Sequence, residues 1–176
     1  MQYYLIVSFL LMMIQSSVIF DFNHIVGVSS WSIVDDDVMG GRSSGRCYLN
    51  EDGNGIFEGE ISLKNNGGFS SVRYRFDKLS TQSYSKIVLR VKGDGKKYQF
   101  RIKHRSTDYY SYISYFQSAS EWKIIEIPLA DMYPAFRGRT LDISNFQADS
   151  IEEIAFLIGN KKAESFKLEI DRIVLK

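Results

Sequence analysis

The stretch from Lys86 to Lys103 has the sequence KIVLRVKGDGKKYQFRIK, and this stretch decides the fold class. Apolar and polar residues alternate on both sides of an Asp-Gly pair, a pattern typical of two β-strands joined by a tight turn. Asp-Gly suits a type I′ turn, because both central residues of that turn need a positive φ. We therefore expect a hairpin with three inward apolar pairs: Ile87 with Ile102, Leu89 with Phe100, and Val91 with Tyr98.

The other face of this expected hairpin is basic. It carries Lys86, Arg90, Lys92, Lys97, Arg101 and Lys103. Like charges on one strand face repel one another unless the face meets water or an anion. The pattern indicates a solvated or edge-protecting face, or a contact with an acidic partner or anionic ligand. We expect no nucleic acid, because this face lacks a platform of aromatic rings on which bases could stack.

Alternation in residues 57–76 predicts a second hairpin. Its apolar pairs are Ile61 with Val72 and Phe57 with Phe76, which leaves Asn65–Gly68 as a four-residue loop, a common hairpin length. In the same register, two cross-strand ion pairs are expected on the other face: Glu60 with Arg73 and Glu58 with Arg75.

Turn signals continue along the whole chain. Gly40-Gly41, Asp52-Gly53, Asn65–Gly68, Asp94-Gly95 and Gly138 separate short apolar runs of period two. This spacing is typical of an all-β antiparallel β-sandwich. In the last run the parity of the apolar residues changes after Ile170, which predicts a β-bulge near Asp171-Arg172. With 176 residues and no linker-like segment, we expect one sandwich domain over residues 18–176.

Composition excludes several function classes. The net charge is only +1, from 22 basic and 21 acidic residues, so a dominantly polyanion-binding surface is excluded. The single cysteine, Cys47, cannot form an internal disulfide, and two histidines leave little room for metal or histidine chemistry. No set of nucleophile, base and orienting group is evident in the sequence. We expect a protein that is not an enzyme, with no cofactor and no metal.

The N-terminal segment is apolar from Tyr3 to Ile14, with Ser8 as the one polar interruption. It suits the apolar core of a secretory signal, so we interpret residues 1–17 as a signal peptide or N-terminal hydrophobic segment. The alternative is a buried first strand. We expect export to the periplasm or outside the cell, with the cytoplasm as the alternative. The absence of early arginine argues against targeting to the mitochondrial matrix.

Two glycine-containing segments are candidates for a site: Trp31–Ser43, with the sequence WSIVDDDVMGGRS, and Asn65–Arg73, with the sequence NNGGFSSVR. A glycine pair lets the backbone turn through positive φ and approach another chain closely. The loop from Asp35 to Ser43 is interpreted either as an internal lock, in which an aspartate accepts backbone N–H bonds, or as a binding site. Arg42 is expected to pair with one of the three aspartates.

The densest aromatic stretch runs from Tyr109 to Phe116. One face of the expected strand belongs to the core, and the other, with Tyr109 and Tyr115, could stack sugars or be ordinary surface.

These segments resemble the complex I intermediate-associated protein family, the assembly-factor domain of NADH:ubiquinone oxidoreductase. The resemblance runs from Val18 to Lys176. It includes Phe20-Asp21-Phe22, the two glycine-containing segments, Phe57-Glu58-Gly59, Trp122 with Ile127-Pro128-Leu129, Phe136-Arg137-Gly138 and Leu168–Ile173. The resemblance implies a jelly-roll sandwich like that of galactose-binding domains. It also implies a non-catalytic factor that binds assembly intermediates of respiratory complex I (NADH dehydrogenase), and so binds incompletely folded protein.

We therefore expect a protein-binding module whose partner is a protein such as a complex I assembly intermediate. The alternative is a carbohydrate-binding module of a cell-surface or exported protein. Contact with a membrane is expected only through a partner or an uncleaved N-terminal segment. The candidate binding residues are Asp35, Asp36, Asp37, Met39, Gly40, Gly41, Arg42, Ser43, Asn65, Asn66, Gly67, Gly68, Phe69 and Arg73.

Overall fold

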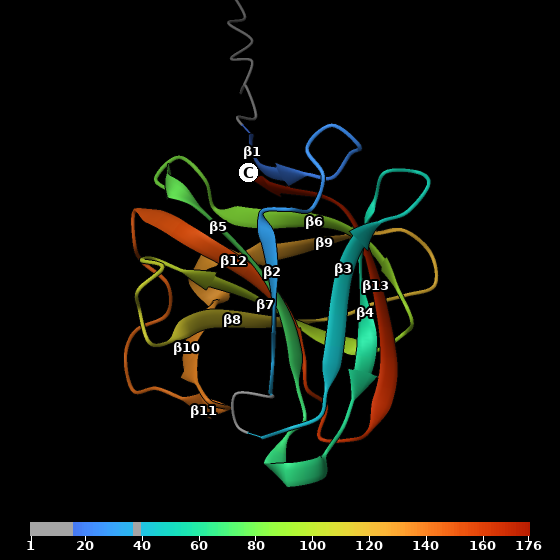
Figure 1. Cartoon of the computed structure of the whole chain (residues 1–176). Helices are drawn as coiled ribbons and strands as arrows, with labels where there is room; N and C mark the ends of the chain where they lie inside the picture. The colour runs from blue at the N-terminus through green and yellow to red at the C-terminus, as the bar shows by residue number, and fades with distance from the viewer. Residues whose placement is uncertain (1–15, 37–39) are drawn as a thin grey trace, which may run out of the picture.

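The computed structural model describes residues 16–36 and 40–176, which form two antiparallel sheets packed face to face (Figure 1). The six-stranded sheet has the order β3 (Ser44–Leu49), β4 (Gly55–Ile61), β13 (Glu164–Leu175), β6 (Lys86–Gly93), β9 (Lys123–Pro128), and β1 (Ser17–Asp21) also pairs with β13. The seven-stranded sheet has the order β11 (Arg139–Thr140), β10 (Tyr133–Phe136), β8 (Ser111–Gln117), β7 (Lys97–Lys103), β12 (Ser150–Ile158), β5 (Ser70–Ser80), β2 (Trp31–Asp35). The predicted all-β antiparallel sandwich is confirmed.

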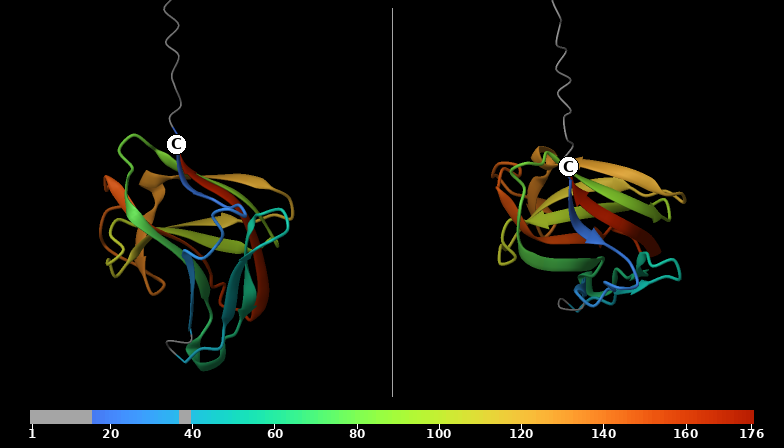
Figure 2. Two further views of the ribbon diagram at one scale, coloured as in Figure 1. Left: turned by 45° about the horizontal axis from the view of Figure 1, so that its top comes forward. Right: turned by 90° about the horizontal axis from the view of Figure 1, so that it is seen from above.

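Short 3-10 turns, η2 (Lys64–Asn66) and η3 (Leu129–Asp131), complete the described elements. Within residues 16–36 and 40–176, no helix has the length and apolar character needed to cross a membrane. Of the predicted N-terminal segment of residues 1–17, residues 1–15 lie outside the described part of the chain. β1 begins at Ser17 and lies beside the end of β13, where the chain also ends (Figures 1 and 2).

The core lies between the two sheets and is rich in aromatic rings. Phe156 on β12 is fully buried, and its ring centroid lies 5.2 Å from that of Phe100 and 6.3 Å from those of Trp31 and Phe116. Edge-to-face and tilted ring pairs of this kind add to the stabilisation gained from the buried apolar area. All four rings belong to strands of the seven-stranded sheet, so this sheet contributes an aromatic layer to the core.

The hairpin expected over residues 86–103 is wrong, although its alternation is right. β6 belongs to the six-stranded sheet and β7 to the seven-stranded sheet, so the link through Asp94-Gly95 crosses between the sheets. The predicted inward residues, including Leu89 and Phe100, are buried, but they face each other across the core. The six basic residues are therefore divided between two sheets instead of sharing one face. Alternation specifies which side chains point inward, and does not specify which strand is the neighbour.

The hairpin expected over residues 57–76 is wrong for the same reason. β4 pairs with β3 and β13, whereas β5 pairs with β12 and β2. Glu58 forms ion pairs with Arg46 and Lys167 and not with Arg75. Arg75 instead binds Glu153, with Nε 2.8 Å from Oε2.

The predicted bulge in the last strand is confirmed. Ile170 pairs with Val91 and Arg172 pairs with Arg90, so Asp171 is the extra residue of β13. The insertion restores the burial of Ile173 and Leu175 after the change of parity.

We expect Phe156→Ala to lower the free energy of unfolding by about 3–5 kcal/mol, because it removes a fully buried ring from the centre of the core. Ile124→Ala is the control, since Ile124 is 58% exposed on β9 and its removal should change stability by less than about 0.5 kcal/mol. Urea unfolding followed by tryptophan fluorescence measures both. Equal losses for the two variants would contradict the assigned core.

Candidate functional site

The two predicted glycine-containing segments meet at one end of the sandwich. Residues 40–43, the described end of the connection from β2 to β3, lie beside the connection from β4 to β5, at the bottom of Figure 1 and of the left view of Figure 2. Asn65 Nδ2 donates a hydrogen bond to the carbonyl oxygen of Gly40 at 2.8 Å. Both connections join one sheet to the other, so the crossovers are tied together here.

The main tie between these segments is the carboxylate of Asp36, which is only 1% exposed. Its Oδ1 accepts a hydrogen bond from the Ser43 N–H at 3.0 Å. Its Oδ2 accepts from Ser43 Oγ at 2.6 Å, from the Gly68 N–H at 2.5 Å and from the Phe69 N–H at 3.2 Å. Asp36 is therefore an internal lock made with backbone N–H groups.

Hydrogen bonding and burial act in opposite directions on the pKa of Asp36. Burial raises it, but the bonds from Ser43, Gly68 and Phe69 together hold the pKa below its ordinary value of 3.8. The folded protein therefore stabilises the ionised form of the Asp36 carboxylate.

Glycine is required beside this carboxylate because of space. A Cβ at Gly41 would lie 2.1 Å from Asp36 Oδ1, and one at Gly67 would lie 2.5 Å from Oδ2. We expected a positive φ in each glycine pair. It is found at the glycine that does not face the carboxylate, which is Gly40 (83°) beside Gly41 and Gly68 (141°) beside Gly67.

The expected pairing of Arg42 is not found among the described residues. Arg42 is exposed, and no ion pair of the described part of the chain includes it. The Asp36 carboxylate, which we expected to be one of the partners open to this guanidinium, accepts backbone N–H groups instead. Asp35 Oδ2 accepts from the Gly45 N–H at 2.9 Å. Asp37 and Met39 lie outside the described residues.

Next to the lock, a groove of about 980 Å³ runs over the outer face of the seven-stranded sheet. Five of the predicted site residues line it: Asn66, Gly67, Gly68, Phe69 and Arg73. Asp36, Gly41 and Ser43 lie behind this wall and position it, through the bonds to Gly68 and Phe69. The structure thus divides eight of the predicted residues into five that line the groove and three that support it.

The lining of the groove carries an excess of positive charge. Its described cations are Arg73, Arg101, Lys103, Arg137 and Lys161, and its one described carboxylate is Glu153. Glu153 is 3% exposed and is already bound to Arg75 at 2.8 Å, with Lys103 Nζ at 3.9 Å. The sequence pointed to Arg101 and Lys103 as basic-face residues, but it gave no sign that β12 lies beside them.

Burial depresses the pKa values of three cations in the groove, Arg73, Arg101 and Lys103. Burial, followed by repulsion from Arg73, lowers the pKa of Arg101 to about 10. Burial also lowers the pKa of Lys103, against the attraction of Glu153, and Arg73 and Arg75 lower it further. Gln99 Oε1 accepts from Arg101 Nε at 2.9 Å and Nη2 at 2.5 Å, which fixes the plane of that guanidinium.

Exposed aromatic rings lie at one side of the groove. Tyr109 is 66% exposed and Phe136 is 37% exposed, and their ring centroids are 5.3 Å apart, edge to face. The guanidinium of Arg137 lies 5.2 Å from the centre of the Phe136 ring. Tyr115, the other tyrosine singled out by the sequence, bonds to Gln99 through its hydroxyl at 2.7 Å and does not line the groove.

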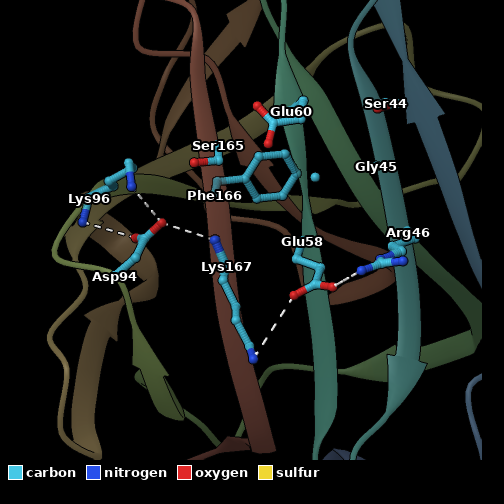
Figure 3. A pocket seen from close by; sticks show the side chains of 11 residues that line it. Ser44, Gly45, Arg46, Glu58, Glu60, Asp94, Lys96, Ser165, Phe166 and Lys167 are labelled. Atoms are coloured by element: carbon cyan, nitrogen blue, oxygen red, sulfur yellow. Dashed lines mark hydrogen bonds and ion pairs between the residues drawn. The ribbon is translucent and has the colours of Figure 1, made fainter.

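A second, polar pocket of about 590 Å³ lies over β3, β4 and β13 (Figure 3). Its charged groups are largely paired with one another. Asp94 binds Lys96 Nζ and the Lys167 N–H, both at 2.9 Å, and Glu58 binds Arg46. Two of its three carboxylates, Asp94 and Glu58, already have cations, so most of the charge in this pocket is balanced within the protein.

The described residues contain no group of three or more histidine, cysteine, aspartate or glutamate side chains that could hold a metal ion.

Residues 20–170 match the complex I intermediate-associated protein 30 (CIA30) family. The chain belongs to this family. Complex I intermediate-associated protein 30, mitochondrial, of Mus musculus is 24% identical over 182 residues. That alignment covers 90% of this chain and only 56% of the mouse protein.

Solved structures show the same fold at low identity. The family 11 carbohydrate-binding module of a cellulosomal cellulase from Clostridium thermocellum superposes with a TM-score of 0.71 at 22% identity, over 92% of this chain and 94% of that chain. Its complex with a β-1,3-1,4-mixed-linked tetrasaccharide gives 0.69 at 22% identity, over 91% and 94%. The jelly-roll, galactose-binding-like sandwich implied by the resemblance is confirmed for this CIA30-family chain.

We expect Asp36→Ala to lower the free energy of unfolding by about 2–4 kcal/mol at pH 7, because several buried donors lose their acceptor. The folded-state pKa is depressed, so the stabilisation is complete above the ordinary value of 3.8 and is lost as the pH falls through the lower folded-state pKa. The difference between wild type and variant should therefore shrink in acid.

Urea unfolding at several pH values measures this difference. Arg42→Ala is the control and should lower the free energy of unfolding by less than about 1 kcal/mol, since Arg42 is exposed. A wild-type advantage over Asp36→Ala that stays constant from neutral to acidic pH would contradict the role of the ionised carboxylate.

Proposed function

We propose that this chain is a non-catalytic protein-binding module of the complex I assembly-factor type, and that it binds its partner in the groove of the seven-stranded sheet. Family membership supports a relation to assembly factors. The observation that carries the choice of surface is the lining of the groove. There, exposed rings lie beside arginines that have no carboxylate partner among the described residues. Aromatic and arginine side chains are the residue types that dominate binding energy at protein interfaces.

Site-specific photo-crosslinking in the native cell tests this proposal. A photo-reactive phenylalanine analogue at Tyr109 or Phe136 should crosslink to subunits of NADH dehydrogenase assembly intermediates. The same analogue at Ile124, which is 58% exposed on the other sheet, is the matched control and should give no such product. Equal products from all three positions, or products without any NADH dehydrogenase subunit, would contradict the proposal.

Carbohydrate binding is the second candidate, and the exposed Tyr109–Phe136 pair favours it. Flat aromatic rings with polar neighbours stack on sugar rings, and the sandwich fold is that of carbohydrate-binding modules. On a glycan array, wild type should then bind neutral β-glucans, and Tyr109→Ala should lose at least about tenfold in affinity. Absence of binding by wild type would eliminate this candidate.

A further inference from the structure

The cross-strand register of β12 with its two neighbours places two rows of side chains on the groove face of the sheet. In one row Glu153 pairs with Lys103 on β7 and with Arg75 on β5. This row has the charge order cation, carboxylate, cation, and Glu153 is bound to both neighbours. In this row one carboxylate on β12 supplies the counter-charge for a cation on each neighbouring strand.

The next row on the same face lacks the carboxylate. Ala155 pairs with Arg101 on β7 and with Arg73 on β5, so its charge order is cation, alanine, cation. Neighbouring strands are about 4.8 Å apart, so the two arginine backbones stand about 10 Å apart with only a methyl group between them. All three residues line the groove.

Neither arginine of this row has a carboxylate within 4 Å among the described residues. Arg73 donates from Nε to Ser71 Oγ at 3.3 Å, and Arg101 donates to Gln99. No described hydrogen bond uses the two terminal nitrogens of Arg73 or Nη1 of Arg101. Partly buried guanidinium groups without a counter-charge are unfavourable, and a carboxylate is the anion that their planar geometry fits best.

We propose that the position over Ala155 binds a carboxylate from an acidic segment of a polypeptide partner, held between Arg73 and Arg101. This inference rests on the proposed function and names the chemistry of its ligand. The rest of the groove lining explains why the ligand is a polypeptide. Beside the cations, apolar side chains line the groove, namely Val34, Leu63, Phe69, Phe136 and Leu157. A chain with both acidic and apolar side chains satisfies both kinds of lining, whereas a small free anion leaves the apolar part uncovered.

Fluorescence anisotropy with a short labelled oligoglutamate peptide tests the site directly. Wild type should bind it, and should bind a length-matched oligoglutamine peptide at least about tenfold more weakly. Arg101→Gln and Arg73→Gln should each lose about tenfold or more in affinity for oligoglutamate. Arg172→Gln removes the same charge from an exposed position on the other sheet and should retain wild-type affinity.

Ala155→Glu places an internal carboxylate in the second row, as Glu153 does in the first. This variant should lose at least about tenfold in affinity for oligoglutamate and should melt at a higher temperature than Ala155→Gln, which has the same size without the charge. The comparison of melting temperatures also shows that loss of binding is not loss of folding. Equal melting temperatures together with unchanged affinity would overturn the inference.

Two further results would overturn the inference. One is wild-type affinity for oligoglutamate that no arginine substitution changes, and the other is tighter binding of an oligogalacturonate, which would assign the row to an acidic glycan. The two proposals can fail separately. Native-cell crosslinks from Phe136 that persist in Ala155→Glu would overturn this inference alone. Arginine-dependent binding of oligoglutamate without crosslinks to NADH dehydrogenase subunits would overturn the proposed function alone.

Discussion

The Asp36 carboxylate is the interaction on which the end of the sandwich and the wall of the groove depend. Asp36 follows β2, which belongs to the seven-stranded sheet, and Ser43 precedes β3 of the six-stranded sheet. Gly68 and Phe69 end the connection that returns from β4 to β5. One buried anion therefore holds two crossovers between the sheets through four hydrogen bonds. Because a buried carboxylate without donors is strongly unfavourable, these segments are constrained to move together.

Side-chain alternation predicted the inward residues of β6 and β7 correctly and their partner strands incorrectly. A short link such as Asp94-Gly95 fits a hairpin, but it also fits a crossover in which both apolar faces turn toward the same core. Local sequence contains the period of a strand, while the choice of neighbour depends on which distant strands cover the edges. β12 and β13 lie between β5 and β7 and between β4 and β6, respectively, and both are far away in the sequence. The bulge at Asp171 was predictable because a change of parity is a local signal.

The same distinction explains how much of the candidate site the sequence contained. The two glycine-containing segments were recognisable, and the lock type of contact followed from an aspartate that can accept backbone N–H bonds. The assignment of the lock to Asp36, with N–H donors in place of Arg42, required the positions of Gly68 and Phe69, more than 30 residues later in the chain. Ala155 gave no signal at all, because an alanine in a buried strand is ordinary until Arg73 and Arg101 are known to stand beside it.

The two outer faces of the sandwich differ in how far their charges are paired within the protein. On the six-stranded sheet, Arg90 pairs with Asp171 at 3.0 Å, Lys92 with Glu169 at 3.5 Å and Arg46 with Glu58, so charge is balanced within the chain. On the groove face of the seven-stranded sheet, Glu153 forms ion pairs in only one row, although the arginines of the next row are partly buried. An imbalance of this kind lowers the stability of the isolated chain, and a partner that supplies the missing charge recovers it on binding. The self-paired face stabilises the fold, and the face with the unpaired arginine row is the one that we propose for recognition.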